Sequence, residues 1–220
     1  MADAKVKIGD AFRFGWQIFK SNIWFLIGVT LVQFLLPRLA SPFMDTENEA
    51  MRFTILVISV GLSMLLSIGA IKIALALVDG KRPEFAELFR HYRFIARYFG
   101  LSLIYSVIIT AGFVLLIIPG IYWALKYQFA AYFVVDKNLG VFEAFHRSAD
   151  ITRGVKWPLF QFMMVQIPLN LLGFLALGVG LLVTIPVTML AYGKIYRDLE
   201  KGSVPTVAPP SSPATPAPSP

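Results

Sequence analysis

The chain contains no cysteine, which excludes disulfide bonds, thiolate metal sites and cysteine nucleophiles. Charge is also scarce: Asp, Glu, Lys and Arg make up 15% of the residues, against roughly 25% in ordinary soluble domains. The two histidines, His91 and His146, lie far apart in sequence, so we expect them to face solvent or lipid headgroups rather than a metal. Nucleotide-binding, serine-hydrolase and zinc-protease motifs are missing too. The sequence therefore predicts a protein that is not an enzyme and has no cofactor.

Long apolar stretches fill the sequence instead. Trp157–Gly193 has no charged residue, and Tyr98–Val135 has only Lys126. Because a membrane-spanning helix needs about 20 apolar residues, each stretch predicts a hairpin of two spans. Two earlier apolar runs raise the predicted total to six spans. The predicted boundaries of these spans are 22–40, 53–78, 97–118, 121–135, 157–177 and 179–196.

Proline and glycine mark the predicted turns of the two later hairpins. Pro119 and Gly120 are expected to turn the chain in the first of them, because proline breaks the helical ladder and glycine permits a turn. Gly178 and Gly180 are expected to turn the last hairpin. Pro186 is then predicted to kink the sixth span.

An amphipathic segment precedes each predicted pair of spans, at residues 5–20, 83–92 and 139–152. Apolar residues recur at helical spacing with basic residues between them, a pattern typical of helices in the membrane interface. For the first segment, packing against a neighbouring helix is the alternative. Weak matches between the segments predict three repeated units around a pseudo-threefold axis along the membrane normal.

The predicted fold is therefore all-α: a polytopic membrane bundle of six transmembrane helices in three hairpin units, with interfacial amphipathic helices. One membrane domain covers residues 1–200. Residues 201–220 form a Pro-rich tail that is expected to be disordered, because it lacks the apolar residues needed for a core.

Lysine and arginine gather on one side of the predicted spans. Sixteen basic residues lie there, whereas the opposite side has Arg38 and Arg52 beside several acids. Because short basic loops stay in the cytoplasm, both termini are predicted to be cytoplasmic in a bacterial inner membrane. The loop over residues 41–51 is predicted to lie outside. The formal charge of +7 then reflects topology and contact with an anionic inner leaflet rather than nucleic acid.

Small polar residues recur at every fourth position within two of the predicted spans. Membrane helices associate through close packing and hydrogen bonds across such faces, so we expect these residues to pack in the bundle. A polar track for a solute is the alternative. The residues are Ser59, Ser63, Ser67, Ser102, Ser106 and Thr110.

Lys126 and Lys72 are the candidate functional residues, because a charge within the membrane is costly and usually faces a partner or a cavity. Lys72 can snorkel toward the nearby cytoplasmic end of its span. Lys126 lies deeper, and the predicted spans contain no acid to pair with it. Its candidate partners are a carbonyl, an amide such as Gln128, water, or an anion such as a lipid phosphate. Simple snorkelling and transport chemistry are the alternatives.

Three short motifs resemble one bacterial family of six-span membrane proteins. They are Leu116-Ile-Ile-Pro-Gly-Ile-Tyr122, Val141-Phe-Glu-Ala-Phe-His-Arg-Ser148 and Trp157-Pro-Leu-Phe160. The family includes the YciC-like proteins and the membrane domain fused to some glycerophosphodiester phosphodiesterases. The resemblance implies a six-span fold and, at Lys126, a basic residue. It implies no phosphodiesterase activity, since the catalytic barrel and its metal-binding acids are missing from this sequence.

Two functions follow as hypotheses. The first is a non-catalytic scaffold that binds anionic lipid, a membrane-protein partner or a second copy of the chain at the cytoplasmic leaflet. The second is transport of a small anion or amphiphile between the hairpins. Access to Lys126 from one face or from both would distinguish them.

Overall fold

The computed structural model describes residues 7–39, 47–176 and 178–203, and every regular element within them is helical. Two of these elements are short 3-10 helices, η2 and η3, and the others are α-helices. The elements are α1 (Ile8–Ser21), α2 (Ile23–Arg38), α3 (Glu49–Val78), η2 (Phe85–Leu88), η3 (Tyr92–Phe94), α4 (Ile95–Leu115), α5 (Ile117–Tyr127), α6 (Ala130–Lys137), α7 (Val141–Ile151), α8 (Lys156–Leu175) and α9 (Leu181–Ser203).

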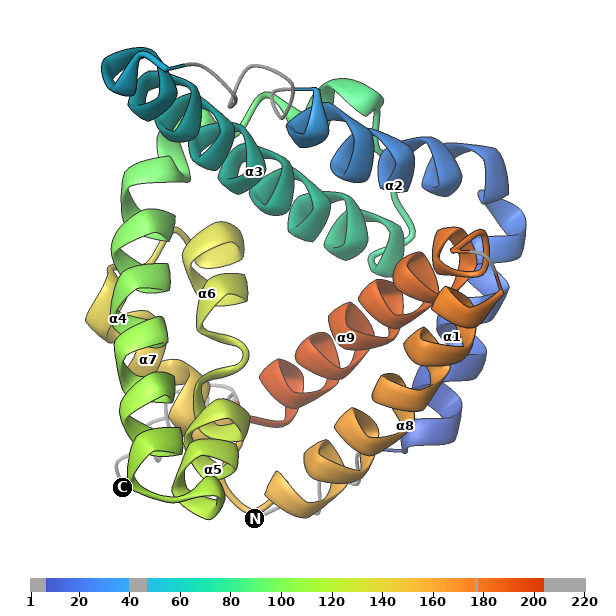
Figure 1. Ribbon diagram of the computed structural model, residues 1–220. Helices are drawn as coiled ribbons and strands as arrows, with labels where there is room; N and C mark the ends of the chain where they lie inside the picture. Colours follow the sequence, from blue (N-terminus) through green and yellow to red (C-terminus); the bar gives the residue numbers. More distant parts are fainter. Residues whose placement is uncertain (1–6, 40–46, 177, 204–220) are drawn as a thin grey trace, which may run out of the picture.

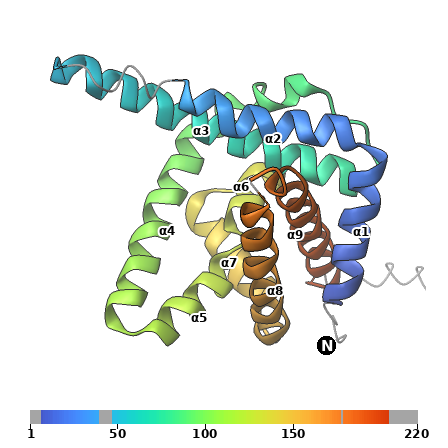
Figure 2. The same cartoon turned by 45° about the vertical axis from the view of Figure 1, so that its right-hand side comes forward.

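Three pairs of helices surround the centre of the molecule. In Figure 1 the pairs α2–α3, α4–α5 and α8–α9 form the sides of a rough triangle. Helix α1 packs along α9, and α6 and α7 lie between α4 and α9. Figure 2 shows that α2 and α3 run across the ends of the other helices. The pairs α2–α3 and α8–α9 cover residues of two predicted hairpin units, whereas the predicted span 121–135 of the third unit is divided between α5 and α6.

Aromatic side chains from α6 and α9 form the centre of the main core. The rings of Tyr132 and Tyr196 lie 5.2 Å apart, and Phe133 meets Tyr196 edge-on at the same distance. Phe129 contacts both Tyr192 and Tyr196. Aromatic pairs of this kind stabilise a core by about 0.5–1.5 kcal/mol beyond the area that they bury. They hold α6 against α9 although α6 is only two turns long.

Three stretches are long and apolar enough to cross a membrane: Glu49–Val78, Phe85–Leu115 and Lys156–Leu175. Helices α1 and α2 supply a fourth if they are counted as one span, although the chain bends by 99° between them. By length and composition the described helices therefore offer three or four spans, and the predicted six are not confirmed.

The amphipathic segments differ from the prediction. Residues 83–92 contain only the short 3-10 helix η2 and the start of η3, instead of an interfacial α-helix. Helix α1 matches the first segment, but its Ala11, Gly15 and Phe19 are buried, and α9 is its main neighbour. Packing of this helix against a neighbour is the alternative to a helix in the membrane interface that the sequence left open. Helix α7 likewise buries one face against the protein, while Phe142 from its predicted apolar stripe is exposed.

The α4–α5 hairpin turns earlier than predicted. Helix α4 ends at Leu115, Leu116 is extended, and Pro119 and Gly120 already lie in the first turn of α5. Proline is tolerated there because the first helical N–H groups need no partner within the helix. Gly120 is a contact position instead: a Cβ on Gly112 would lie 2.8 Å from the Gly120 Cα. The missing side chains let the two helices meet beside the turn.

The last hairpin turns where the sequence predicts. Helix α8 ends at Leu175, and Gly178 has a φ of +75°, a conformation that favours glycine. Pro186 lies within α9, at the predicted position. Helix α9 continues to Ser203, and residues 204–220, which hold most of the predicted tail, lie outside the described residues.

The predicted span 121–135 is not one helix, because the chain breaks between α5 and α6. Helix α7 supplies the side chains that stabilise this break. The Ser148 hydroxyl donates to the Lys126 carbonyl at 3.0 Å and accepts from the Phe129 N–H at 3.2 Å. The Thr152 hydroxyl also donates to the Lys126 carbonyl, at 3.2 Å. The two hydroxyls therefore satisfy backbone groups that a continuous helix would have paired internally.

Candidate functional site: a polar central cavity

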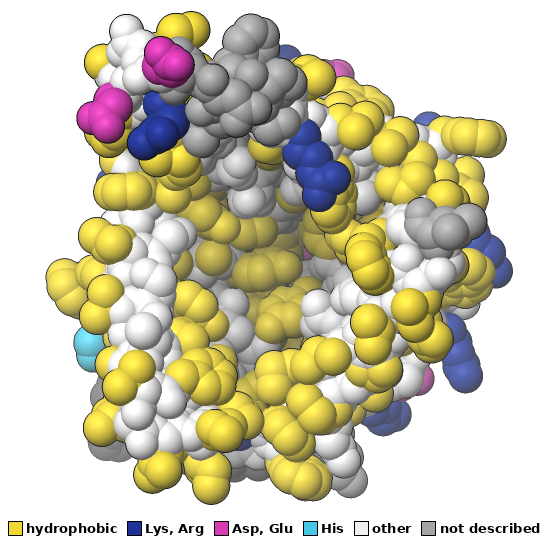
Figure 3. Space-filling model, in the orientation of Figure 1, with side chains coloured by type: hydrophobic (Ala, Val, Ile, Leu, Met, Phe, Trp, Pro, Cys, Tyr) yellow, Lys and Arg dark blue, Asp and Glu magenta, His cyan; other side chains and the backbone are white. Residues whose placement is uncertain are grey.

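A cavity of about 340 Å³ lies where the three helix pairs meet. Figure 3, in the orientation of Figure 1, shows a hollow at the centre of the molecular surface. Six helices line the cavity, namely α2, α3, α4, α6, α8 and α9. Its polar lining residues are Gln33, Ser67, Tyr98, Tyr132, Gln166, Asn170, Thr188 and Tyr192.

Asn170 provides the least satisfied polar group of the cavity. Its Oδ1 atom is buried and has no hydrogen-bond partner. Gln166 lies one turn earlier on α8, and its amide also makes no hydrogen bond with the described residues. The i, i+4 spacing places both amides on one face of α8, which is the face toward the cavity.

Most of the other polar groups in the lining already have partners. The hydroxyls of Ser67 and Thr188 donate to carbonyls of their own helices, at 2.8 and 2.9 Å. The Gln33 amide donates to the Leu66 carbonyl at 3.4 Å. The Tyr192 hydroxyl donates to Gln128 Oε1. The unused hydrogen-bonding capacity therefore lies at Gln166 and Asn170 of α8 and at the Tyr132 hydroxyl of α6.

The cavity suits binding better than acid–base chemistry. Its lining holds amides, hydroxyls and apolar side chains, and it includes no Asp, Glu, His, Lys or Arg. Among the described residues, no group of three or more His, Asp or Glu is placed to hold a metal ion. Such a lining can bind the polar part of an uncharged group through hydrogen bonds.

Lys126 and Lys72 lie outside the cavity lining. Lys126 is half-buried in the last turn of α5, with its Nζ 4.9 Å from the ring centre of Tyr127. Lys72 is half-buried too, with its Nζ 5.7 Å from the ring centre of Phe94. Neither lysine forms an ion pair with the described residues. Gln128, the predicted amide partner of Lys126, bonds Tyr192 and the Leu125 carbonyl instead.

The serine stripe of α3 makes hydrogen bonds within its own helix. Ser63 donates to the Ser59 carbonyl and Ser67 to the Ser63 carbonyl, each at 2.8 Å. These three serines and Ser102 line a shallow hollow of about 330 Å³ between α3 and α4. The remaining two positions of the α4 stripe, Ser106 and Thr110, are exposed and line a separate hollow. The two stripes therefore come together only at the end nearest Ser67 and Ser102.

A cluster of charged side chains joins the ends of α3, α6 and α9. The Arg197 guanidinium donates to both carboxylate oxygens of Asp79, at 2.8 and 2.9 Å. It also donates to Asp136, at 2.6 and 3.1 Å, and to Glu200 at 3.2 Å. Lys137 pairs with Glu200 and lies 3.7 Å from Asp136. Asp79 and Asp136, each at the end of its own helix, are therefore joined through Arg197 to α9.

The charge of Arg197 changes the acidity of Asp136. Burial acts to raise the pKa of the Asp136 carboxyl, but the hydrogen bonds and positive charge of Arg197 outweigh burial. The net result is a pKa below the ordinary range, so Asp136 is ionised at neutral pH. This cluster was not predicted from the sequence, because Arg197 lies 118 residues from Asp79 and 61 residues from Asp136. The sequence signal that could have indicated the cluster is an acid at the end of each of two apolar runs, Asp79 and Asp136, and a basic residue, Arg197, after a third.

The relatives that resemble this chain are described as uncharacterised proteins. Proteins of Mycobacterium bovis and of two Mycobacterium tuberculosis strains, all described as uncharacterised, are 25% identical to this chain over 240 aligned positions. The alignment covers 94% of this chain and 72% of each relative. No solved structure matches the chain. Residues 46–219 match the family described as a domain of unknown function, DUF7847, and the chain belongs to that family.

Proposed function

We propose that this protein is a non-catalytic membrane protein that binds the uncharged polar part of a lipid or similar amphiphile in its central cavity. The observation behind this proposal is the buried Asn170 Oδ1 without a partner. Leaving a buried acceptor unsatisfied costs about 1–3 kcal/mol. A ligand that donates a hydrogen bond to Asn170 would remove this cost, and Gln166 beside it can donate or accept a second bond.

Access to the cavity supports a ligand that comes from the bilayer. The cavity and the hollow between α3 and α4 share Ser67 and Tyr98 as lining residues. These two shared side chains therefore lie between the hollow and the cavity. In the predicted topology the hollow faces lipid, and an amphiphile would move sideways between α3 and α4 with its polar end along the serines.

The proposed setting is a bacterial cytoplasmic membrane with both termini in the cytoplasm. The apolar helices and the one-sided distribution of basic residues support this setting. Six crossings, and the finer kinship with YciC-like proteins and the phosphodiesterase membrane domain, belong to the same proposal. A membrane-protein partner or a second copy of the chain is compatible with it.

Transport of a neutral amphiphile is a second candidate function, and the position of the cavity favours it. An open cavity lined by helices from all three pairs resembles the sites between repeated units at which transporters bind their substrates. The lining contains no basic residue, so a small anion, the other cargo considered from sequence, fits this site less well. Labelling of a cysteine at Asn170 from both membrane faces would favour transport, whereas access from one side at most would favour a binding protein.

Native mass spectrometry of the protein purified in mild detergent tests the proposal. The wild type is compared with Asn170→Leu and Gln166→Leu, and Gln161→Leu serves as a matched control because Gln161 is exposed on the same helix. We expect a defined lipid on the wild type and the control, and at least a tenfold loss on Asn170→Leu, as expected for about 1.4 kcal/mol. Identical lipid profiles for all four proteins would contradict the proposal.

A further inference from the structure

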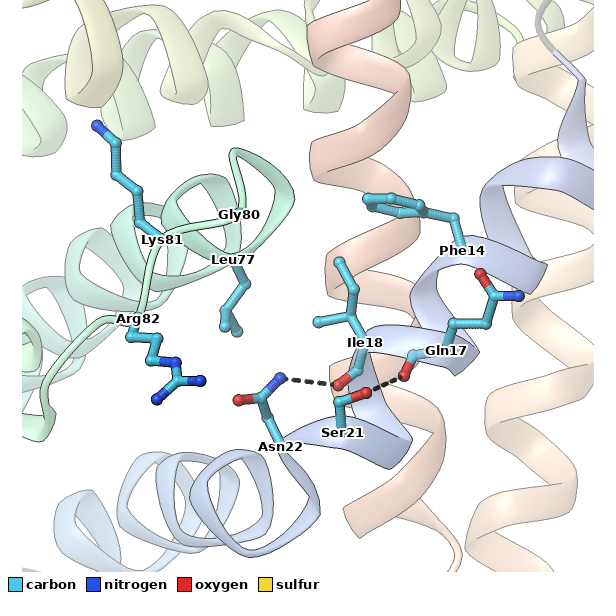
Figure 4. A pocket seen from close by; sticks show the side chains of 9 residues that line it. All are labelled: Phe14, Gln17, Ile18, Ser21, Asn22, Leu77, Gly80, Lys81 and Arg82. Atoms are coloured by element: carbon cyan, nitrogen blue, oxygen red, sulfur yellow. Dashed lines mark hydrogen bonds between the residues drawn. The ribbon is translucent and has the colours of Figure 1, made fainter.

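A second, larger hollow lies at the elbow between α1 and α2. It has a volume of about 600 Å³, and we call it the elbow pocket. Gln17 and Ser21 line it from α1, Asn22 lies at the bend, and Gly80, Lys81 and Arg82 line it from the loop after α3. None of these residues lines the central cavity. Figure 4 shows the Arg82 guanidinium pointing across the opening toward Asn22, while Lys81 extends along the rim in another direction.

The positive charge of the elbow pocket is not neutralised by acids of the described chain. Lys81 and Arg82 form no ion pair with the described residues. Asp79 is close in sequence, but Arg197 holds it at 2.8 Å. Lys194 lies 5.5 Å from the ring centre of Phe14, another lining residue, and is paired with Asp198. The pocket therefore attracts an anion.

The donors of the pocket suit a phosphate group. A guanidinium presents a planar fork of N–H groups that matches two oxygens of a phosphate. The Gln17 amide makes no hydrogen bond with the described residues and can add a further donor. Ser21 Oγ and Asn22 Nδ2 each donate to a carbonyl of α1 at 3.1 Å, which uses the one donor of Ser21 and one of the two N–H donors of Asn22.

The surroundings of the pocket indicate where that phosphate would come from. Helix α1 has an exposed Trp16 and an exposed Lys20 with its Nζ 5.9 Å from the Trp16 ring centre. Tryptophan and lysine are typical of the zone of lipid headgroups. The distribution of basic residues predicts that α1 and the loop after α3 face the cytoplasm, where the anionic lipids lie.

We propose that the elbow pocket binds a phosphate anion, held by Arg82 and attracted by Lys81. The phosphate belongs to an anionic lipid headgroup or is free in solution, and the two sources present the same oxygens to Arg82. This site is independent of the central cavity, so Asn170→Leu should leave it unchanged.

Thermal unfolding of the full chain in a neutral detergent, followed by tryptophan fluorescence, tests this site. Phosphatidylglycerol, phosphatidylcholine and inorganic phosphate are titrated separately. We expect phosphatidylglycerol to raise the melting temperature of the wild type and phosphatidylcholine to have little effect. In Arg82→Gln the half-saturating concentration should rise about tenfold, the change that loss of a charge-assisted bidentate contact predicts. Lys81→Gln should show a smaller rise, and added salt should weaken binding in every protein.

Arg13→Gln is the matched control, because Arg13 is exposed on α1 and does not line the pocket. It should bind like the wild type, and Arg82→Lys should fall between the wild type and Arg82→Gln. A shift produced by inorganic phosphate that depends on Arg82 would identify free phosphate as the source, and a shift produced by the lipid alone would identify the headgroup. If Arg82→Gln and Arg13→Gln respond equally, the effect reflects net charge and the proposal is wrong.

Discussion

Single polar residues in this protein fall into two classes, and the difference lies in whether their partners are present. Arg197 has several carboxylate oxygens within hydrogen-bond distance, and Asp79 and Asp136 come from helices that are distant in sequence. Asn170 Oδ1 is equally enclosed but has no partner. Buried polar groups are normally satisfied, so the ion pairs of Arg197 account for the first class, and the unpaired Asn170 Oδ1 is the basis of the proposed binding site.

Replacement of Arg197 by Met should destabilise the protein by about 3 kcal/mol, because Asp79 loses its partner and the buried Asp136 keeps only Lys137 and Tyr196. The wild type should also lose stability in acid. The pKa of Asp136 is lowered in the folded protein, so its stabilising effect is complete above its ordinary pKa of about 3.9. That effect disappears as the pH falls through the lower, folded value. Unfolding in detergent from pH 7 to pH 3 measures both effects.

Lys201→Met is the control for this experiment, because Lys201 is exposed near the end of the same helix. Its stability and pH dependence should match those of the wild type. If Arg197→Met keeps the full acid sensitivity of the wild type between pH 5 and pH 3, the pairing of Arg197 with Asp136 does not cause it.

Helices in this fold depend on contacts with other helices, and the break between α5 and α6 shows why. Residues 121–135 are apolar enough for one continuous helix. Nevertheless, helix α5 ends at Tyr127 and helix α6 begins at Ala130. The hydroxyl of Ser148 bonds groups on both sides of the break. The aromatic core around Phe129 then fixes α6 against α9.

Replacement of Ser148 by Ala should therefore cost about 1–3 kcal/mol, because the buried N–H of Phe129 loses its acceptor. The Lys126 carbonyl keeps Thr152 as a donor, so Ser148→Ala combined with Thr152→Ala should cost more than Ser148→Ala alone. Ser106→Ala is the matched control, since Ser106 is exposed and bonds only its own helix. Equal melting temperatures for Ser148→Ala and Ser106→Ala would show that the hydroxyl does not hold the break.

The whole molecule combines long apolar helices and an apolar core with one cavity that polar side chains line. The apolar surface lies on the outside: Val114 and Ile118, at the α4–α5 turn, are each 80% exposed. The polar side chains of six helices meet inside. Exposed apolar side chains of this kind are favourable where the surroundings are lipid, because they then lose nothing by facing outward.

Cysteine labelling can test the topology directly, since the native chain has no cysteine to remove. Single cysteines at Lys201 and Lys81 should react with a membrane-impermeant maleimide only in inverted vesicles. Cysteines at Arg52 and Val179 should react only in intact cells or spheroplasts, because both lie on the side predicted to be outside. Reaction of Val179 from the inside would mean that α8 and α9 do not cross as a pair, and the count of six spans would then be wrong.

Composition and periodicity were sufficient for the class of the protein and for much of its helical outline. Apolar runs of span length, with turns near glycine, follow from local properties of the chain. The prediction of a turn at Pro119 and Gly120 was wrong by a few residues, because proline is as acceptable in the first turn of a helix as in the turn before it. The prediction of a helix over 83–92 was wrong, because amphipathic spacing does not distinguish an α-helix from a short 3-10 helix. Here the 3-10 helix η2 packs with Leu88 against Gly69 of α3.

The sequence by itself determined an all-helical protein with helices apolar and long enough to cross a membrane, since both properties follow from local patterns along the chain. Only the tertiary structure decided which polar residues share a site. Asn170 and Gln166 line the central cavity together with residues of five other helices. Lys126, the candidate that its charge favoured, lies outside this cavity. The reason is physical: the cost of a buried polar group depends on its partners, and these partners come from helices that are distant in sequence.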